Sequence, residues 1–265
     1  MILYLFLSQL GIGIFFTLAL ISREAGVKFF RFNAGLAATL IAIGFAFRPS
    51  DDTGAFALAA FAALIVAEAG IVLYWSTVGR TLASIRPMIV WTSVVAGTVA
   101  VVAQGLAASA GNAVGSETLT IASFITSAAF LGGACTAMVL GHWYLVLPSM
   151  QVSHLQSVVK LHIVSMVIRI AVVAAAVFVA IASWQPGAAP GPSFGHYILS
   201  IDGIFFWQRI LFGLAAPVFL AYLTWETAKI RSTQSATGIL YVDFFTIVVG
   251  EVLAKWVLLA TRVPV

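Results

Sequence analysis

Hydrophobic positions along the chain form long runs that are separated by short polar breaks. Most runs reach the ~20 apolar residues that a helix needs to cross the hydrocarbon core of a bilayer. They lack the two-residue alternation of barrel strands, and lipid cannot satisfy the open backbone groups of irregular chain, so helices are the expected spanning elements. The pattern predicts eight spans, at residues 2–22, 30–47, 55–76, 87–108, 118–147, 158–183, 203–228 and 237–261.

The polar breaks contain residues that typically form turns and helix caps, as in "RPSDDTG" at 48–54 and "RSTQSATG" at 231–238. The longest break, at 183–203, is rich in Pro and Gly and cannot continue a helix, so it is expected to be an external loop. No break is long enough for a separate soluble domain. The sequence therefore predicts an all-α integral membrane protein in which residues 1–265 form a single bundle of eight transmembrane helices.

Composition supports this class, because 62% of the residues are hydrophobic and only 8% are charged, against about a quarter charged in soluble domains. The basic residues predicted to flank the spans are unevenly divided between the two sides. One side receives Arg23, Lys28, Arg31, Arg80, Arg86, Lys160, Lys229 and Arg231, and the other receives Arg48 and Arg262. Lys and Arg are retained on the cytoplasmic side, so both termini are expected on the non-cytoplasmic side of a bacterial inner membrane. In this orientation the basic residues that give the net charge of +4 lie beside anionic lipid headgroups. The charge therefore indicates a lipid partner and no nucleic-acid partner.

Six charged residues fall inside predicted spans, where a charge costs at least ~2.5–3.5 kcal/mol unless it is paired, neutralised or facing water. These residues are Glu68, Arg169, Arg209, Asp243, Glu251 and Lys255. They are expected to point into the bundle. Glu251 and Lys255 have the i, i+4 spacing that lets an acid meet a base on one helix face. With Arg209 at similar depth, the simplest interpretation is a structural ion network that joins the last two spans, although Lys255 could also extend to the interface.

Two histidines flank one short predicted loop, in the stretch "LGHWYLVLPSMQVSHLQSVVKLH" at 140–162. His142 lies six residues before Pro148, and His162 lies about four residues into the next predicted span. Since the two spans run in opposite directions, the two imidazoles are expected at similar depth near the cytoplasmic face. Such a pair could share a metal ion, a haem iron or a proton-accepting substrate.

Three kinds of ligand fit these residues. In one, His142 and His162 are the axial metal ligands of a b-type haem, and Arg169 pairs with a propionate. In another, the histidines and Arg169 bind a quinone headgroup, while Glu68 or Asp243 acts as the catalytic carboxylate that transfers the proton. The cofactor is accordingly predicted to be quinone or haem b.

A third ligand is copper(I), for which soft donors are suited. The stripe Cys135, Met138 and His142 on one helix and Met166 beside His162 on the next would supply them. The alternative without a ligand places His142 in an interfacial aromatic belt with its neighbours in "HWY", and His162 near the headgroups.

The fifth and seventh spans contain residues that affect how helices pack. Ala129, Gly133 and Ala137 repeat every four residues and form a face that lets another helix approach closely, so the fifth span is expected to be central. Pro217 is expected to distort the seventh span and to free a carbonyl near Gly213.

The sequence thus favours a membrane subunit of a respiratory or electron-transfer complex, either non-catalytic or reactive with quinone, which exchanges electrons with partner redox and membrane subunits. This expectation follows because little chain lies outside the membrane and no nucleotide or dinucleotide motif is present. By architecture alone, the chain is similar to the loop-poor subunits that anchor respiratory oxidoreductases. The alternatives are a proton-coupled transporter and a purely structural subunit.

Overall fold

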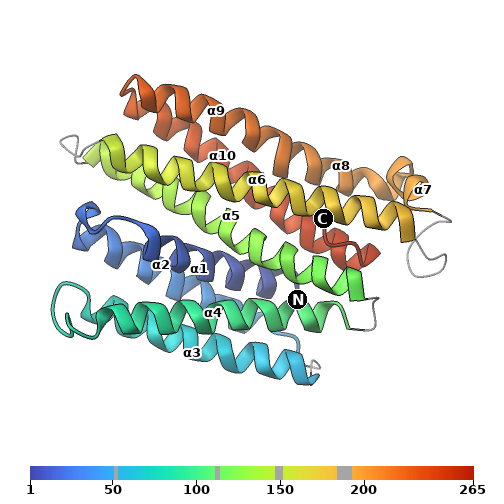
Figure 1. Ribbon diagram of the computed structural model, residues 1–265, viewed down its shortest axis with the longest axis horizontal. Helices are drawn as coiled ribbons and strands as arrows, with labels where there is room; N and C mark the ends of the chain where they lie inside the picture. Colours follow the sequence, from blue (N-terminus) through green and yellow to red (C-terminus); the bar gives the residue numbers. More distant parts are fainter. Residues whose placement is uncertain (51–52, 111–113, 147–151, 184–192) are drawn as a thin grey trace.

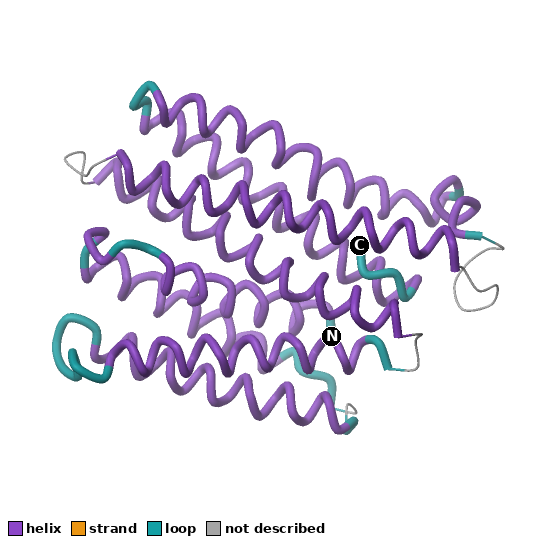
Figure 2. Tube along the Cα trace, viewed as in Figure 1, coloured by secondary structure: helices purple, strands orange, loops and turns teal. Residues whose placement is uncertain are grey.

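The computed structural model describes the chain except for residues 51–52, 111–113, 147–151 and 184–192, and the side chains of 114–116. Its described residues form helices joined by short turns, with no strand among them (Figure 2). Eight helical segments are long and apolar enough to cross a membrane. The predicted all-helical class and the number of spans are confirmed, and the chain is a multi-pass integral membrane protein.

Six of the spans are single helices that begin and end within a few residues of the predicted bounds, namely α1 (Ile2–Leu20), α2 (Val27–Ala46), α3 (Ala55–Thr77), α4 (Arg86–Ala108), α5 (Val114–Val146) and α10 (Thr233–Thr261). The sixth span, α6 (Val152–Ser183), begins six residues earlier than predicted. The seventh span is composite. It consists of the 3₁₀ turn η2 (Ile201–Gly203), α8 (Ile204–Ile210), the π-helical segment η3 (Leu211–Ala215) and α9 (Ala216–Lys229). Two short elements lie in the breaks, the 3₁₀ turn η1 (Arg23–Ala25) and α7 (Phe194–Leu199).

The spans are arranged as two groups of four that lie side by side (Figure 1). In the first group, α1 packs against α2 and α4, and α3 packs against both α2 and α4. In the second group the neighbours are α5 with α6, α6 with α9, α9 with α10, and α10 with α5. Helices α6 and α10 are therefore diagonal, and their inward side chains meet across the centre of the second group.

Helix α5 joins the two groups, because it packs against α1 and α4 on one side and against α6 and α10 on the other. Its predicted central position is confirmed. The tightest approach, however, involves Gly132 and not the predicted face of Ala129, Gly133 and Ala137. A Cβ added at Gly132 would overlap the main chain of Gly13 on α1, whereas a Cβ at Gly133 would point to α6. Consecutive helical residues differ by about 100° in direction, so the two glycines serve different neighbours.

Replacing Gly132 by Val is expected to destabilise the protein by about 3 kcal/mol, because the added atoms meet backbone that cannot move aside as a side chain would. A matched control is Gly238→Ala in α10, where an added Cβ meets nothing within 4 Å. That change removes a flexible residue from an exposed position of α10 and should stabilise the protein by about 0.5–1 kcal/mol. Thermal unfolding of the purified variants in one detergent measures both effects. Equal unfolding temperatures for the two variants would contradict this description of the α1–α5 contact.

The composite seventh span contains the predicted distortion. Pro217 has no N–H to donate to the carbonyl of Gly213, one turn earlier, and the helix widens into the π-helical segment η3 just before it. A Cβ added at Gly213 would meet the Cα of Gly250, so η3 approaches α10 very closely. Single π-helical turns of this kind occur frequently at functional sites.

Basic residues gather at one end of the two groups, in the turns (Arg23, Arg80 and Arg231) and in the adjoining helix ends (Lys28, Arg86 and Lys229). Segments 21–26, 78–85 and 230–232 lie together at the left end in Figure 1, while α7 lies at the opposite end. The alternating direction of the spans is as predicted.

Candidate functional site

The centre of the second group holds a fully buried pair of ionisable side chains. His162 on α6 and Asp243 on α10 are both 0% exposed, and the imidazole Nε2 lies 2.9 Å from the carboxylate Oδ2. With Asp243 ionised, the ring N–H is the donor, since a carboxylate only accepts hydrogen bonds. His162 and Asp243 were predicted to belong to one site, and the structure brings them into direct contact.

Helix α5 covers His162 on one side of the pair. The ring of Phe130 stacks on the imidazole with a centroid distance of 5.4 Å and an interplanar angle of 0°. Gly133 faces the same part of α6, since a Cβ there would lie 3.3 Å from the Ser165 hydroxyl and 3.5 Å from the His162 Cα. Two atoms of the pair, Nδ1 of His162 and Oδ1 of Asp243, have no hydrogen-bond partner among the described residues. Each partner therefore retains one free position for a proton or a polar ligand.

A second buried cluster lies on the same two helices, and its centre is the carboxylate of Glu251 on α10. Arg169 on α6 donates to it through Nε at 3.0 Å and Nη2 at 3.2 Å, which is the fork geometry of a bidentate pair. Arg209 on α8 donates from Nη2 to Oε1 at 2.8 Å. Lys255, one turn beyond Glu251, donates to Oε2 at 3.1 Å. The sequence-based network of Arg209, Glu251 and Lys255 is thus present, and Arg169 also belongs to it.

Helix α5 completes the cluster with two serines. Ser127 donates to Oε2 of Glu251 at 2.6 Å and accepts from the Lys255 ammonium at 2.5 Å. Ser123 accepts from Nη1 of Arg169, through its hydroxyl at 2.7 Å and its carbonyl at 3.1 Å. The main-chain oxygen of Val265 accepts from Nη2 of Arg169 at 3.2 Å. Neither serine was predicted from the sequence, because small hydroxyl residues are common in spanning helices.

The two polar layers are stacked along the bundle axis. His162 and Arg169 are seven residues apart on α6, and Asp243 and Glu251 are eight apart on α10, so the layers are separated by roughly 10–12 Å. Met166 and Ile247 follow the His–Asp pair by one turn on the same helix faces, and both are buried in the apolar core. Apolar side chains therefore separate the two layers.

His142 lies outside this site. It is exposed on α5, and its Nδ1 is 3.0 Å from the hydroxyl of Tyr241 on α10. The prediction that His142 and His162 lie at the same depth is wrong, since Gly133, which is level with His162, is nine residues or ~13 Å from His142 along α5. The cause is the early start of α6 at Val152, which places His162 about three turns inside the helix.

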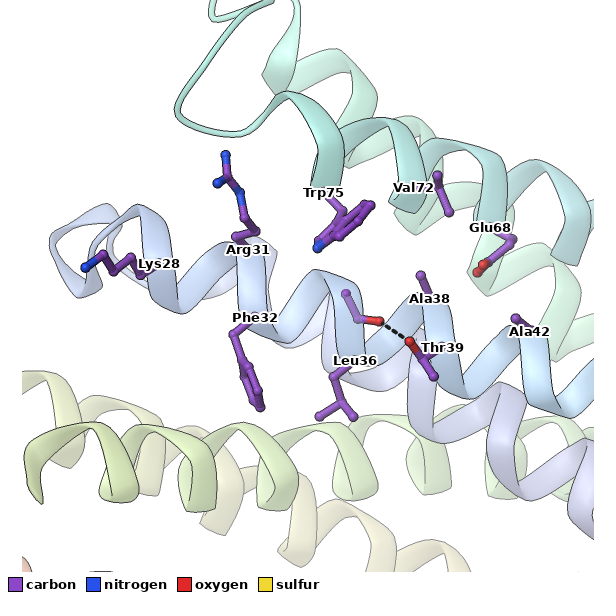
Figure 3. Close-up of a pocket in the computed structure, with 11 residues that line it drawn as sticks. Lys28, Arg31, Phe32, Leu36, Ala38, Thr39, Ala42, Glu68, Val72 and Trp75 are labelled. Carbon is purple, nitrogen blue, oxygen red and sulfur yellow. Dashed lines mark hydrogen bonds between the residues drawn. The ribbon is translucent and has the colours of Figure 1, made fainter. Parts of the chain in front are cut away.

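Glu68 is also separate from the His–Asp pair. It lies in the first group, in a groove of about 740 Å³ that is lined by residues of α2 and α3 (Figure 3). Lys28 and Arg31 lie toward one end of this groove and Glu68 lies farther along it, with Trp75 and Val72 between them (Figure 3). The structure thus places Glu68 away from Asp243, whereas both carboxylates were predicted to line one site.

The groove between α2 and α3 has the chemistry of an amphiphile-binding surface. Arg31 donates from Nη2 to the carbonyl of Val78 at 2.7 Å, which fixes the guanidinium near the end of α3. Gly35 lets the indole of Trp75 lie against α2, because a Cβ there would meet the ring nitrogen. Lys28 and Arg31 suit an anionic headgroup, and the apolar walls of the groove suit a hydrocarbon chain.

No group of three or more His, Cys, Asp or Glu side chains that could hold a metal ion occurs in the described part of the chain. The eight spans and the two buried polar layers define the protein as a multi-pass integral membrane protein with an ionisable core. No protein-family model, curated protein or solved structure matches the chain.

Proposed function

We propose that this protein is a proton-coupled membrane transporter in which His162 and Asp243 form the proton-binding site. The observation that carries the proposal is the fully buried His–Asp pair at the centre of a transmembrane four-helix group. Imidazole is the side chain that most readily gains and loses a proton near neutral pH. With the proton bound, the pair is an imidazolium beside a carboxylate. When the proton leaves, a neutral imidazole and the carboxylate remain, so the core changes by one charge in each cycle.

A purely structural role explains this pair poorly. A buried ion pair is often no more stabilising than well-packed apolar residues of similar volume, because both charges must be removed from water. Inside a membrane, ionisable side chains are therefore rare and typically belong to substrate, ion or proton pathways. The free Nδ1 and Oδ1 atoms support the same interpretation, since a purely structural pair would be expected to satisfy them.

Two further features support transport. Met166 and Ile247 separate the two polar layers, and an apolar barrier between polar sites prevents a continuous leak. The span formed by α8, η3 and α9 is interrupted at Pro217, and interrupted helices supply binding sites and moving parts in many transporters. We place the end with most of the basic residues on the cytoplasmic side of a bacterial inner membrane, by the positive-inside rule.

The experiment is proton flux into proteoliposomes that contain the purified chain and a trapped pH-sensitive dye. An imposed membrane potential, negative inside, should drive proton entry faster than in protein-free liposomes of the same lipid. Flux equal to that of protein-free liposomes would overturn the proposal.

The electron-transfer role, its quinone or haem b, and its redox partner subunits stay predictions from the sequence. They depended on a shared site for His142 and His162, and the structure gives these two residues different partners at different depths. The proton-coupled role needs only the contacts that are present.

A further inference from the structure

The groove between α2 and α3 carries two positive charges at the end nearest the turn that follows α3. Lys28 and Arg31 line it there. Arg31 donates from Nη2 to a neutral acceptor, the carbonyl of Val78. Neither Lys28 nor Arg31 pairs with a carboxylate in the described part of the chain. The chain therefore leaves both charges to be balanced by an anion from outside.

The polar group farther along the groove is the carboxyl of Glu68. This residue is half-buried on α3, and its Oε2 has no hydrogen-bond partner among the described residues. The ion pairs of the described residues do not include it. A carboxyl at membrane depth is costly unless it is bonded, and such groups typically belong to ligand or ion sites. Its carboxyl points from α3 toward α2 and borders the groove, so a ligand there could supply the missing bond (Figure 3).

An apolar stretch separates these two polar ends. Arg31 bonds to the carbonyl of Val78, and Glu68 precedes Val78 by ten residues along α3, so the guanidinium and the carboxyl are ~15 Å apart along the groove. Trp75 and Val72 lie between them (Figure 3). The facing side of α2 leaves room for a chain, because it presents small residues at Gly35, Ala38 and Ala42. An extended hydrocarbon chain covers this distance in about twelve carbon–carbon bonds.

We propose that the groove binds a single-chain amphiphile that has an anionic head and a hydroxyl group about twelve carbon atoms along its chain. The head pairs with Lys28 and Arg31, and the chain lies against Trp75 and Val72. The hydroxyl meets Glu68, and because a hydroxyl both donates and accepts, it can bond a carboxyl with or without a proton. Trp75 and Val72 are 45% and 42% exposed, so the ligand can enter sideways from the lipid. The volume of about 740 Å³ is also typical of ligand sites, which measure roughly 300–1,000 Å³.

The test is thermal unfolding of the purified full-length chain in detergent that contains 12-hydroxystearate, stearate or 2-hydroxystearate, at a mildly alkaline pH that ionises the head. Binding to the folded protein alone raises Tm with the logarithm of the mole fraction of the amphiphile in the micelles. The three probes share the head and the chain length, and only 12-hydroxystearate has its hydroxyl at the level of Glu68. It should give the same rise in Tm at about tenfold lower mole fraction than the other two, as expected for one hydrogen bond to a charged group.

The variants assign the two ends of the ligand. Glu68→Ala should remove the preference, so that the three amphiphiles act alike. Arg31→Gln should weaken the response to all three about tenfold, as expected for losing one charge-assisted contact, and Lys28→Gln provides a second variant if Arg31→Gln does not fold. Lys160→Gln is the matched control, because Lys160 is exposed on α6 in the second group, and it should keep the wild-type response.

Equal effects of stearate and 12-hydroxystearate on the wild type would overturn the inference and would indicate an ordinary acyl-chain contact. A preference that survives in Glu68→Ala would also overturn it, and so would unchanged responses in Arg31→Gln and Lys28→Gln. The groove lies in the first group of spans and the pair of His162 and Asp243 in the second, so the two proposals fail separately. Proton flux without this preference would remove the amphiphile site alone, and the preference without proton flux would remove the transport function alone.

Discussion

Glu251→Gln is expected to destabilise the protein by about 3–5 kcal/mol, the cost of removing one partner from a buried ion pair. The effect should lie at the upper end of that range, because Glu251 is the acceptor for Arg169, Arg209 and Lys255 together. An amide can accept hydrogen bonds but leaves three cations without a negative side chain. The yield of folded protein in fluorescence-detected size-exclusion chromatography, followed by thermal unfolding of any folded fraction, measures the loss.

Lys255→Met is the matched control for that stability prediction. It removes one cation from the same cluster and leaves the bidentate pair of Arg169 with Glu251 intact. Removing one of three cations that share a single carboxylate also removes its repulsion with the other two, which offsets the lost contact with Glu251. The unfolding temperature should therefore stay at or above that of the wild type. A fall in unfolding temperature as large as that of Glu251→Gln would show that the Lys255 ammonium is needed to balance the negative charge of Glu251.

Asp243→Asn is expected to reduce proton flux roughly 100-fold, within the range typical for removing a group that transfers protons. The asparagine carbonyl can still accept the hydrogen bond from His162, so the fold should survive. What the variant loses is the negative charge that stabilises the protonated imidazole. Flux in proteoliposomes and elution volume in detergent, measured on the same preparation, separate the two effects.

His196→Ala is the control for this flux prediction, since His196 lies exposed on α7 outside the second group of spans. Its flux should equal that of the wild type. Wild-type flux in Asp243→Asn would place the proton pathway elsewhere.

The fold was largely predictable from the sequence. Runs of about 20 apolar residues are unfavourable in water and stable in a bilayer, and lipid cannot pair with free backbone N–H and C=O groups. Such runs therefore form transmembrane helices. The start of α6 was not predictable in this way. Ser153, His154 and Gln156 are polar and suggest a loop, yet they lie in the first turns of α6, where His154 pairs with Glu24 of η1 at 3.0 Å. Hydropathy marks where a helix enters lipid, and a helix can begin well before that point.

The site was only partly predictable. All six charged residues in the predicted spans are described within spanning segments, and five of them are buried in the second group. The spacing of seven residues between His162 and Arg169, and of eight between Asp243 and Glu251, on two helices of equal direction, was a usable signal for two stacked pairs. The pairing of His142 with Tyr241 was not predictable, because it depends on which helices are neighbours.

Proton binding by His162 and Asp243 is tested most directly by infrared difference spectra of the purified protein between acidic and alkaline buffer. Proton exchange at this pair predicts a shift of the Asp243 carboxylate stretch in the wild type, caused by the change of charge on the His162 imidazole, and this shift should be missing in Asp243→Asn. Identical difference spectra for the wild type and Asp243→Asn would contradict it.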